Sequence, residues 1–111
     1  MEVKFANWNE LPLIPVKDKV TRRVFNEGER CTVTRATLEY GHKPGPHSHE
    51  YEQIALIMQG EADFYVGGVA YPMKAGGIIA IPPNVEHYIV VTSKDVPVIN
   101  MDIFVPKRSD R

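Results

Sequence analysis

Apolar and polar residues alternate along most of this chain in short runs, and turn residues separate one run from the next. Residues 31–38 alternate weakly and are rich in Thr and Val, as expected of a half-buried strand. Gly67 and Gly68 lie between two such runs and predict a two-residue hairpin. The predicted strands cover residues 20–25, 31–38, 53–58, 62–66, 69–73, 78–81, 87–92 and 96–105. Because helical periodicity is absent, the pattern predicts an all-β sandwich or closed barrel.

The first part of the chain has a different pattern. Residues 1–19 carry scattered apolar side chains, and Pro12 and Pro15 lie close together. Two prolines at this spacing exclude a regular helix. We therefore expect residues 1–19 to form an extended arm laid over the body of the domain.

Composition narrows the class of protein. A length of 111 residues predicts one domain spanning 1–111, and 43% hydrophobic and 24% charged residues are ordinary values for a soluble protein. A formal net charge of -1 without a basic stripe argues against nucleic acid as a partner. Gly, Pro or a charge interrupts every apolar run, which argues against a membrane span. The N-terminus lacks signal-peptide features, and Cys31 is alone, so a cytoplasmic location fits best.

Two segments carry candidate metal ligands. His47 and His49 are two residues apart, a spacing that on a strand turns both imidazoles to one face, and Gln53 has the same parity. His87 follows a proline turn in a second strand-like run and could complete the set. Glu52 is the rival to Gln53, because a bulge could bring it inward. His42 has no matching partner, so we expect it to be a solvated loop residue.

The last predicted strand leaves two assignments open. Asn100, Asp102 and Phe104 share one face, and aliphatic residues take the other. In the first assignment the aliphatic face fills the core and Asp102 is solvated. In the second, the aliphatic face packs against another layer or subunit, and Asp102 points toward the metal ligands.

The spacing of these residues resembles the cupin superfamily. Its first motif has Gly, five residues, His-x-His, three or four residues, Glu, six residues and Gly. Its second has Gly, five residues, Pro-x-Gly, two residues, His, three residues and Asn. The matching positions are Gly41, His47, His49, Gln53 and Gly60, then Gly76, Pro82 and His87. Gln53 replaces the usual Glu, Asn84 the glycine and Val91 the final Asn; Asn84 also tolerates a positive φ. The resemblance implies a small antiparallel jelly-roll barrel of the RmlC-like kind, with its motifs in residues 33–104.

The segment from Asp102 to Arg108 resembles the end of one cupin group, the pectin degradation proteins. This resemblance implies a metal-dependent enzyme that converts 4,5-unsaturated uronates from pectin or alginate breakdown to the linear keto form. It implies His47, His49, Gln53 and His87 as metal ligands, and Asp102, Phe104 and Arg108 as catalytic and substrate-holding residues. The opposing interpretation of Arg108 is a frayed, charged tail.

A neutral Gln in place of Glu has a chemical consequence. Three imidazoles and an amide leave the charge of a divalent ion uncompensated, which favours a small anionic substrate. The ligand set does not choose among Ni, Zn, Mn, Fe and Cu. A metal-dependent dioxygenase and a non-catalytic cupin that binds sugar acids stay open as alternatives. The arm and the spare aliphatic face of the last strand predict a homodimer.

Overall fold

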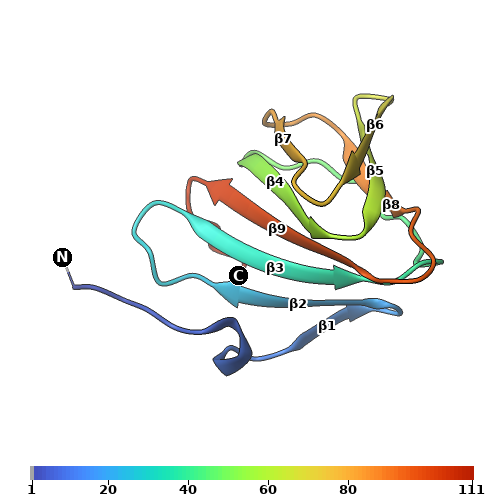
Figure 1. The fold of residues 1–111 in the computed structure, drawn as a ribbon. Helices are drawn as coiled ribbons and strands as arrows, with labels where there is room; N and C mark the ends of the chain where they lie inside the picture. The colour runs from blue at the N-terminus through green and yellow to red at the C-terminus, as the bar shows by residue number, and fades with distance from the viewer. Residues whose placement is uncertain (1) are drawn as a thin grey trace.

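The structure, a computed structural model, describes residues 2–111 and arranges nine strands in two antiparallel sheets (Figure 1). The larger sheet has the strand order β1-β2-β3-β9-β4-β7, and the smaller has the order β6-β5-β8. The bounds are β1 Ile14–Lys17, β2 Val20–Phe25, β3 Thr32–Leu38, β4 Glu52–Gln59, β5 Glu61–Val66, β6 Val69–Lys74, β7 Ile78–Ile81, β8 His87–Val91 and β9 Val98–Val105.

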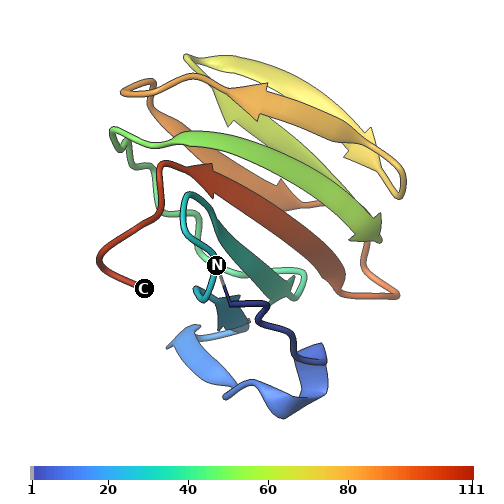
Figure 2. The same cartoon turned by 90° about the vertical axis from the view of Figure 1, so that its left-hand side faces the viewer.

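The two sheets pack face to face with an apolar core between them (Figure 2). The core is built from aliphatic side chains of both sheets and one aromatic ring, Phe64: Val20, Leu38, Ala55, Ile57, Ala62, Phe64, Ile81, Val91 and Val98. In the described residues 2–111 the only helix is a short 3-10 turn, η1 (Trp8–Glu10). The prediction of an all-β jelly roll is therefore confirmed.

Strand β9 lies in the middle of the larger sheet and brings distant residues together. It pairs with β3 on one side and β4 on the other, so that Asp102 lies opposite Thr34 and Phe104 lies opposite Gln53. Asn100 and Phe104 are buried, whereas the aliphatic residues between them are only half-buried. The face of β9 that carries Asp102 therefore points between the sheets.

Local backbone conformation follows the turn residues. Gly67 and Gly68, with φ of 57° and 82°, form the predicted two-residue hairpin between β5 and β6. Asn84 adopts a φ of 64°, a left-handed conformation that asparagine tolerates. At Gly60, with φ of +83°, a Cβ would lie 3.0 Å from Ser93 Oγ and 3.1 Å from the carbonyl oxygen of Pro97, so this turn requires glycine.

Within the expected arm, the described residues form η1 (Trp8–Glu10) and the edge strand β1, which pairs with β2. The Asn7 side chain caps η1, and the Glu10 side chain accepts a hydrogen bond from the Asn7 backbone. Before η1 the chain leads away from the body, and Phe5 is 92% exposed (Figure 1). The described residues contain no helix that is both long and apolar enough to cross a membrane.

Candidate metal centre

Three imidazoles from the two predicted segments converge. The potential ligand atoms of His47, His49 and His87 all lie within 4.8 Å of one another. Reciprocal backbone hydrogen bonds of 3.1 and 2.9 Å join His47 to His87, and the Asn84 N–H donates to the carbonyl oxygen of His49 at 2.7 Å. The prediction that these histidines meet is confirmed, although His47 and His49 lie just before β4 rather than within it.

Hydrogen bonds set the tautomer of all three rings. Each Nδ1 contacts a backbone carbonyl oxygen, which can only accept, so the proton resides on Nδ1 and the lone pair on Nε2. The acceptors for His47, His49 and His87 are the carbonyl oxygens of Gly45, Tyr51 and Val85, at 2.7, 2.9 and 2.9 Å. Nε2 of His87 is buried without a hydrogen-bond partner. This arrangement, with Nδ1 anchored and Nε2 free, is typical of metal-binding histidines.

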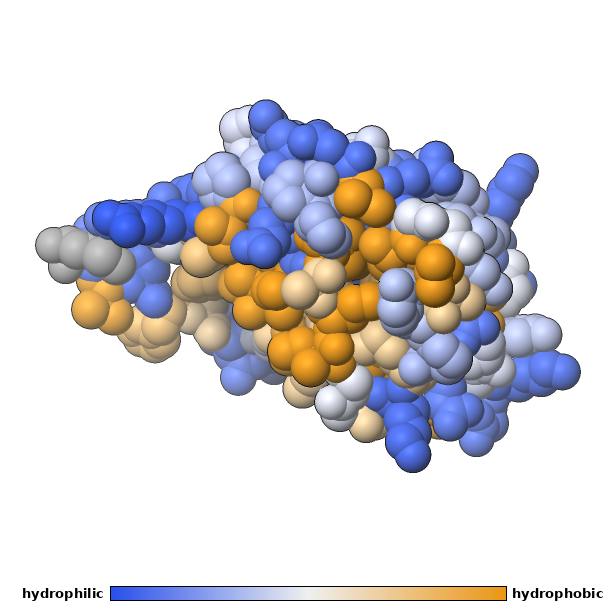
Figure 3. Space-filling view, turned by 90° about the horizontal axis from the view of Figure 1, so that it is seen from above, coloured by the Kyte–Doolittle hydropathy of each residue, from blue (hydrophilic) through white to orange (hydrophobic). Residues whose placement is uncertain are grey.

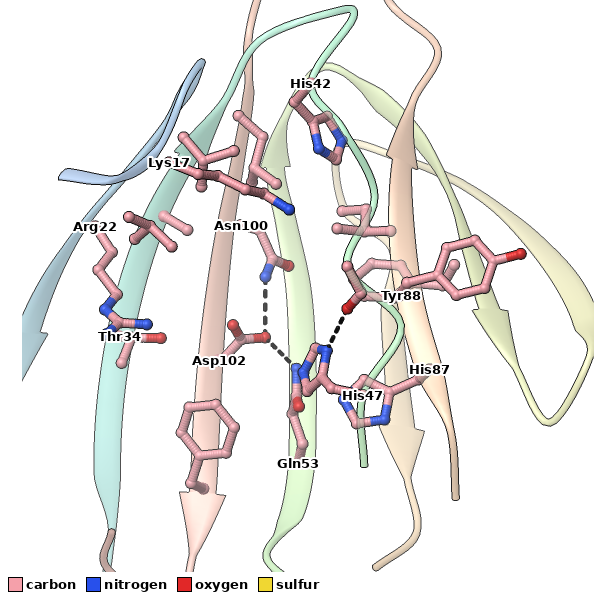
Figure 4. Close-up of a pocket in the computed structure, with 18 of the residues that line it drawn as sticks. Lys17, Arg22, Thr34, His42, His47, Gln53, His87, Tyr88, Asn100 and Asp102 are labelled. Carbon is pink, nitrogen blue, oxygen red and sulfur yellow. Dashed lines mark hydrogen bonds between the residues drawn. The ribbon is translucent and has the colours of Figure 1, made fainter. Parts of the chain in front are cut away.

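The side chain of Gln53 lies beside these three rings. Its amide nitrogen donates to Asp102 Oδ1 at 2.7 Å (Figure 4). This bond leaves the Gln53 oxygen facing His49 Nε2 at 3.0 Å. When the His49 ring is neutral with its proton on Nδ1, neither of these two atoms carries a proton, and their lone pairs repel unless a cation lies between them. The residues therefore fit a divalent metal ion, and Glu52, the rival ligand, is exposed.

The electrostatics of His87 also favour a metal ligand. Burial is the main cause that lowers the pKa of its imidazole, and the neighbouring rings of His47 and His49 lower it further, against the hydrogen bond to Val85. A neutral ring is the form that binds a metal.

Asp102 lies beside this cluster rather than in solvent. Its Oδ1 accepts hydrogen bonds from Gln53 and from the amide nitrogen of Asn100, the latter at 2.9 Å. Burial raises the pKa of the Asp102 carboxyl, although these hydrogen bonds oppose the shift. Of the two assignments that the sequence left open, the solvated Asp102 is therefore wrong.

A cavity of about 190 Å³ opens beside these residues and is lined by His47, Gln53, His87 and Asp102. Four cationic side chains also line it: Lys17, Arg22, Arg108 and Arg111. Arg108 is only 9% exposed, and its guanidinium lies 4.6 Å from the ring centroid of Phe104 and 4.8 Å from that of Tyr51. The interpretation of Arg108 as part of a frayed tail is therefore wrong, and the excess of positive charge favours anionic ligands.

Comparison with known proteins identifies the family that has this architecture. The profile of the cupin domain family matches residues 34–104, which is more than half of the chain. The chain is a cupin. A search of curated proteins returned no match.

Solved structures share the cupin fold at low sequence identity. An RmlC-like cupin from Shewanella frigidimarina is 22% identical with a TM-score of 0.86, covering 98% of this chain and 96% of its own. KdgF from Halomonas sp. is 23% identical with a TM-score of 0.86, covering 98% of both chains. The polyketide cyclase RemF from Streptomyces resistomycificus is 18% identical with a TM-score of 0.79, covering 96% and 81%.

His42 of this cupin is not a solvated loop residue, and that expectation is wrong. The side chain is 7% exposed, reaches into the cavity, and has neither ring nitrogen hydrogen-bonded (Figure 4). Burial and the charge of Lys17 lower the pKa of His42. The loop after β3 folds so that His42 points into the cavity. No local sequence pattern predicts the path of this loop.

Arg22 and Arg111 are two further cavity residues that sequence reasoning missed. The parity of Arg22 with the buried Val20 on β2 could have placed it on the inner face. Arg111 gave no such signal, because the segment after β9 has no periodic pattern.

Proposed function

We propose that this cupin is a metal-dependent enzyme that converts 4,5-unsaturated uronates to the linear keto form. The observation that carries the proposal is the 3.0 Å contact between His49 Nε2 and the Gln53 oxygen, next to the half-buried Asp102 and beside a cavity lined by cationic side chains. The motifs resemble those of small cupins that ketonise unsaturated uronates, and the similarity to KdgF from Halomonas sp. supports that resemblance.

The reaction requires proton movement and charge stabilisation. The ring opens when the bond between the anomeric carbon and the ring oxygen breaks, and the resulting enol becomes a ketone when carbon 4 gains a proton. The product has the same atoms as the substrate, since one proton moves from the anomeric hydroxyl to carbon 4. A divalent ion held by His47, His49, Gln53 and His87 would supply stabilisation of negative charge on oxygen.

Three side chains of the protein supply proton transfer, carboxylate binding and the exclusion of water. Asp102 takes the proton from oxygen and returns it to carbon 4, a role for which burial raises its pKa toward neutrality. Arg108 holds the substrate carboxylate. Phe104, which is 3% exposed and lines the cavity, shapes the pocket and excludes water.

Three neutral imidazoles and a neutral amide also favour an anionic ligand on the metal. A dioxygenase usually has Glu where this chain has Gln53, so the ligand set favours ketonisation. We further propose a homodimer, because Phe5 is 92% and Ile78 65% exposed and apolar side chains gather on one face (Figure 3). The single cysteine, Cys31, supports the proposal of a cytoplasmic location. A monomer at micromolar concentration in small-angle scattering would reject the dimer.

Ketonisation is tested by mixing the protein with unsaturated monomer released by a pectate or alginate lyase, and following the loss of double-bond absorbance. We expect decay faster than the spontaneous rate, and loss of this acceleration in His87→Gln. Decay at the spontaneous rate with metal-loaded protein would reject the proposed function. Oxygen consumption with aromatic diols would instead support a dioxygenase, and tight calorimetric binding of a uronate without turnover would support a binding protein.

A further inference from the structure

Three guanidinium groups gather at one end of the cavity. Arg22 comes from β2, whereas Arg108 and Arg111 come from the segment after β9. The guanidiniums of Arg108 and Arg111 lie 4.6 and 5.7 Å from the ring centroid of Phe104. Burial, followed by repulsion from Arg108 and Arg22, lowers the pKa of Arg111 to about 10. The folded chain thus holds like charges together at a cost in stability.

The nearby carboxylates neutralise this cluster only in part: Asp110 pairs with Arg108, and Asp110 and Asp102 attract Arg111 without forming a salt bridge to it. Asp110 accepts hydrogen bonds from Nε and Nη2 of Arg108, at 2.9 and 2.8 Å. Asp102 accepts its hydrogen bonds from Gln53 and Asn100. Within residues 2–111, neither Arg22 nor Arg111 forms a salt bridge, and the Nε atoms of both are buried without a hydrogen-bond partner.

The hydrogen bonds between Arg108 and Asp110 limit how Arg108 can bind a ligand. A guanidinium binds a carboxylate most strongly along one edge with two parallel hydrogen bonds. The Nε–Nη2 edge of Arg108 is already taken by Asp110, which leaves for a ligand the two hydrogens of Nη1 and the second hydrogen of Nη2. Arg22 and Arg111 have no such internal partner among the described residues.

The segment that carries two of these arginines is held in place. The Asn26 amide nitrogen donates to the carbonyl oxygens of Arg108 and Arg111, both at 3.1 Å, and the Arg108 N–H donates to Thr32 Oγ1 at 2.8 Å. The Thr32 hydroxyl in turn donates to Asn26 Oδ1. Because the backbone is fixed, the guanidiniums are preorganised and a ligand does not have to order them.

We propose, resting on the proposed function for the identity of the ligand, that Arg22 and Arg111 form with Arg108 the site that binds the substrate carboxylate. The carboxylate neutralises the cluster and bonds the guanidinium groups of Arg22 and Arg111 where they line the cavity. It thereby directs the sugar ring toward Asp102 and the three histidines, which line the same cavity or lie beside it.

Calorimetric titration with D-galacturonate tests this site without requiring turnover. Neutral D-galactose, which lacks the carboxylate, is the control ligand. We expect wild-type protein to prefer galacturonate, and Arg22→Gln or Arg111→Gln to weaken galacturonate binding by about 10- to 100-fold while galactose binding is unchanged. Arg30→Gln removes the same charge from an exposed residue outside the cavity and should change binding by less than about twofold.

Melting of the unliganded proteins controls for misfolding. Removing one of three repelling guanidiniums should leave the melting temperature of Arg22→Gln equal to or above that of wild type, which a purely structural role would not do. If that variant fails to fold, Arg22→Lys keeps the charge without the planar fork and should still lose most of the preference for galacturonate. Equal galacturonate binding by wild type and the Arg22 and Arg111 variants, or no preference over galactose in wild type, would overturn the site.

The same samples separate this inference from the proposed function. Arginine-dependent galacturonate binding without turnover of unsaturated monomer rejects the ketonisation and leaves the carboxylate site standing. Turnover with arginine-independent binding rejects the carboxylate site alone.

Discussion

The amide nitrogen of Gln53 donates a 2.7 Å hydrogen bond to Oδ1 of Asp102. This bond decides which end of the Gln53 side chain faces the imidazoles, and it turns the oxygen toward His49. One amide therefore connects the carboxylate proposed to move the proton with the atoms proposed to hold the metal. The two roles can be separated experimentally, because they depend on different properties of Asp102.

Asp102→Asn and Asp102→Ala should differ in metal content but not in loss of activity. Asn keeps an oxygen that can accept from Gln53, so metal occupancy should stay near that of wild type, while ketonisation falls by about 100-fold or more because no carboxylate transfers the proton. Ala releases the Gln53 amide and should also weaken metal binding by about tenfold. Elemental analysis and the absorbance assay measure the two effects, and wild-type turnover in Asp102→Asn would remove Asp102 from the mechanism.

Metal binding should raise the stability of the fold. At a free Zn²⁺ or Ni²⁺ concentration of 100 times the dissociation constant, the free energy of unfolding should rise by about 2.7 kcal/mol, and a chelator should reverse the change. His87→Gln should abolish most of this stabilisation in thermal melts. His42→Gln is the matched control, because His42 lies outside the ligand cluster. Equal stabilisation of both variants would place the ion elsewhere.

Most of the fold can be predicted from the sequence because its signals are local. Two predicted strands, 20–25 and 78–81, match β2 and β7 at both ends, and the hairpin and the conformation of Asn84 follow from turn chemistry. Strand β1 was not predicted, because Pro15 lacks an N–H and is an unfavourable strand residue. The structure accommodates Pro15 at the edge of the sheet, where β1 pairs with β2 alone.

The candidate site is only partly predictable. The convergence of His47, His49 and His87 follows from motif spacing, and the parity of Gln53 from strand geometry. The burial of His42 depends on the path of a loop, and the arginine cluster depends on Arg111 arriving beside Arg22 from the far end of the chain. Such contacts have no periodic signal, so the sequence gives no warning of them.

The buried His42 should make stability fall in mild acid. Its pKa is lowered in the folded state, so below a pH of about 6.5 the unfolded chain takes up a proton that the folded chain refuses. Stability is therefore lost as pH falls through the unfolded pKa toward the folded one, by at most about 1.4 kcal/mol per pH unit for one proton. Urea unfolding of metal-free protein at pH 7.5 and 5.5 should show a larger loss in wild type than in His42→Leu. The same loss in both would mean that folding does not change the pKa of His42.

Thr32 should hold the arginine-bearing segment through a single hydroxyl. This fully buried side chain accepts the N–H of Arg108 and donates to Asn26, so Thr32→Val removes both bonds while keeping the shape. Leaving the Arg108 N–H and the Asn26 oxygen unpaired should cost about 1–3 kcal/mol in urea unfolding. Thr37→Val, on the same strand but only half-buried, should change stability by less than about 0.5 kcal/mol.

A second readout separates positioning from stability alone. Hydrogen exchange at the Arg108 amide should speed up in Thr32→Val more than exchange in the centre of β4, because the segment after β9 opens while the sheet stays paired. Galacturonate affinity should fall with it, since ordering the loosened segment then costs free energy on binding. Uniformly faster exchange with unchanged galacturonate affinity would instead show that Thr32 only stabilises the core.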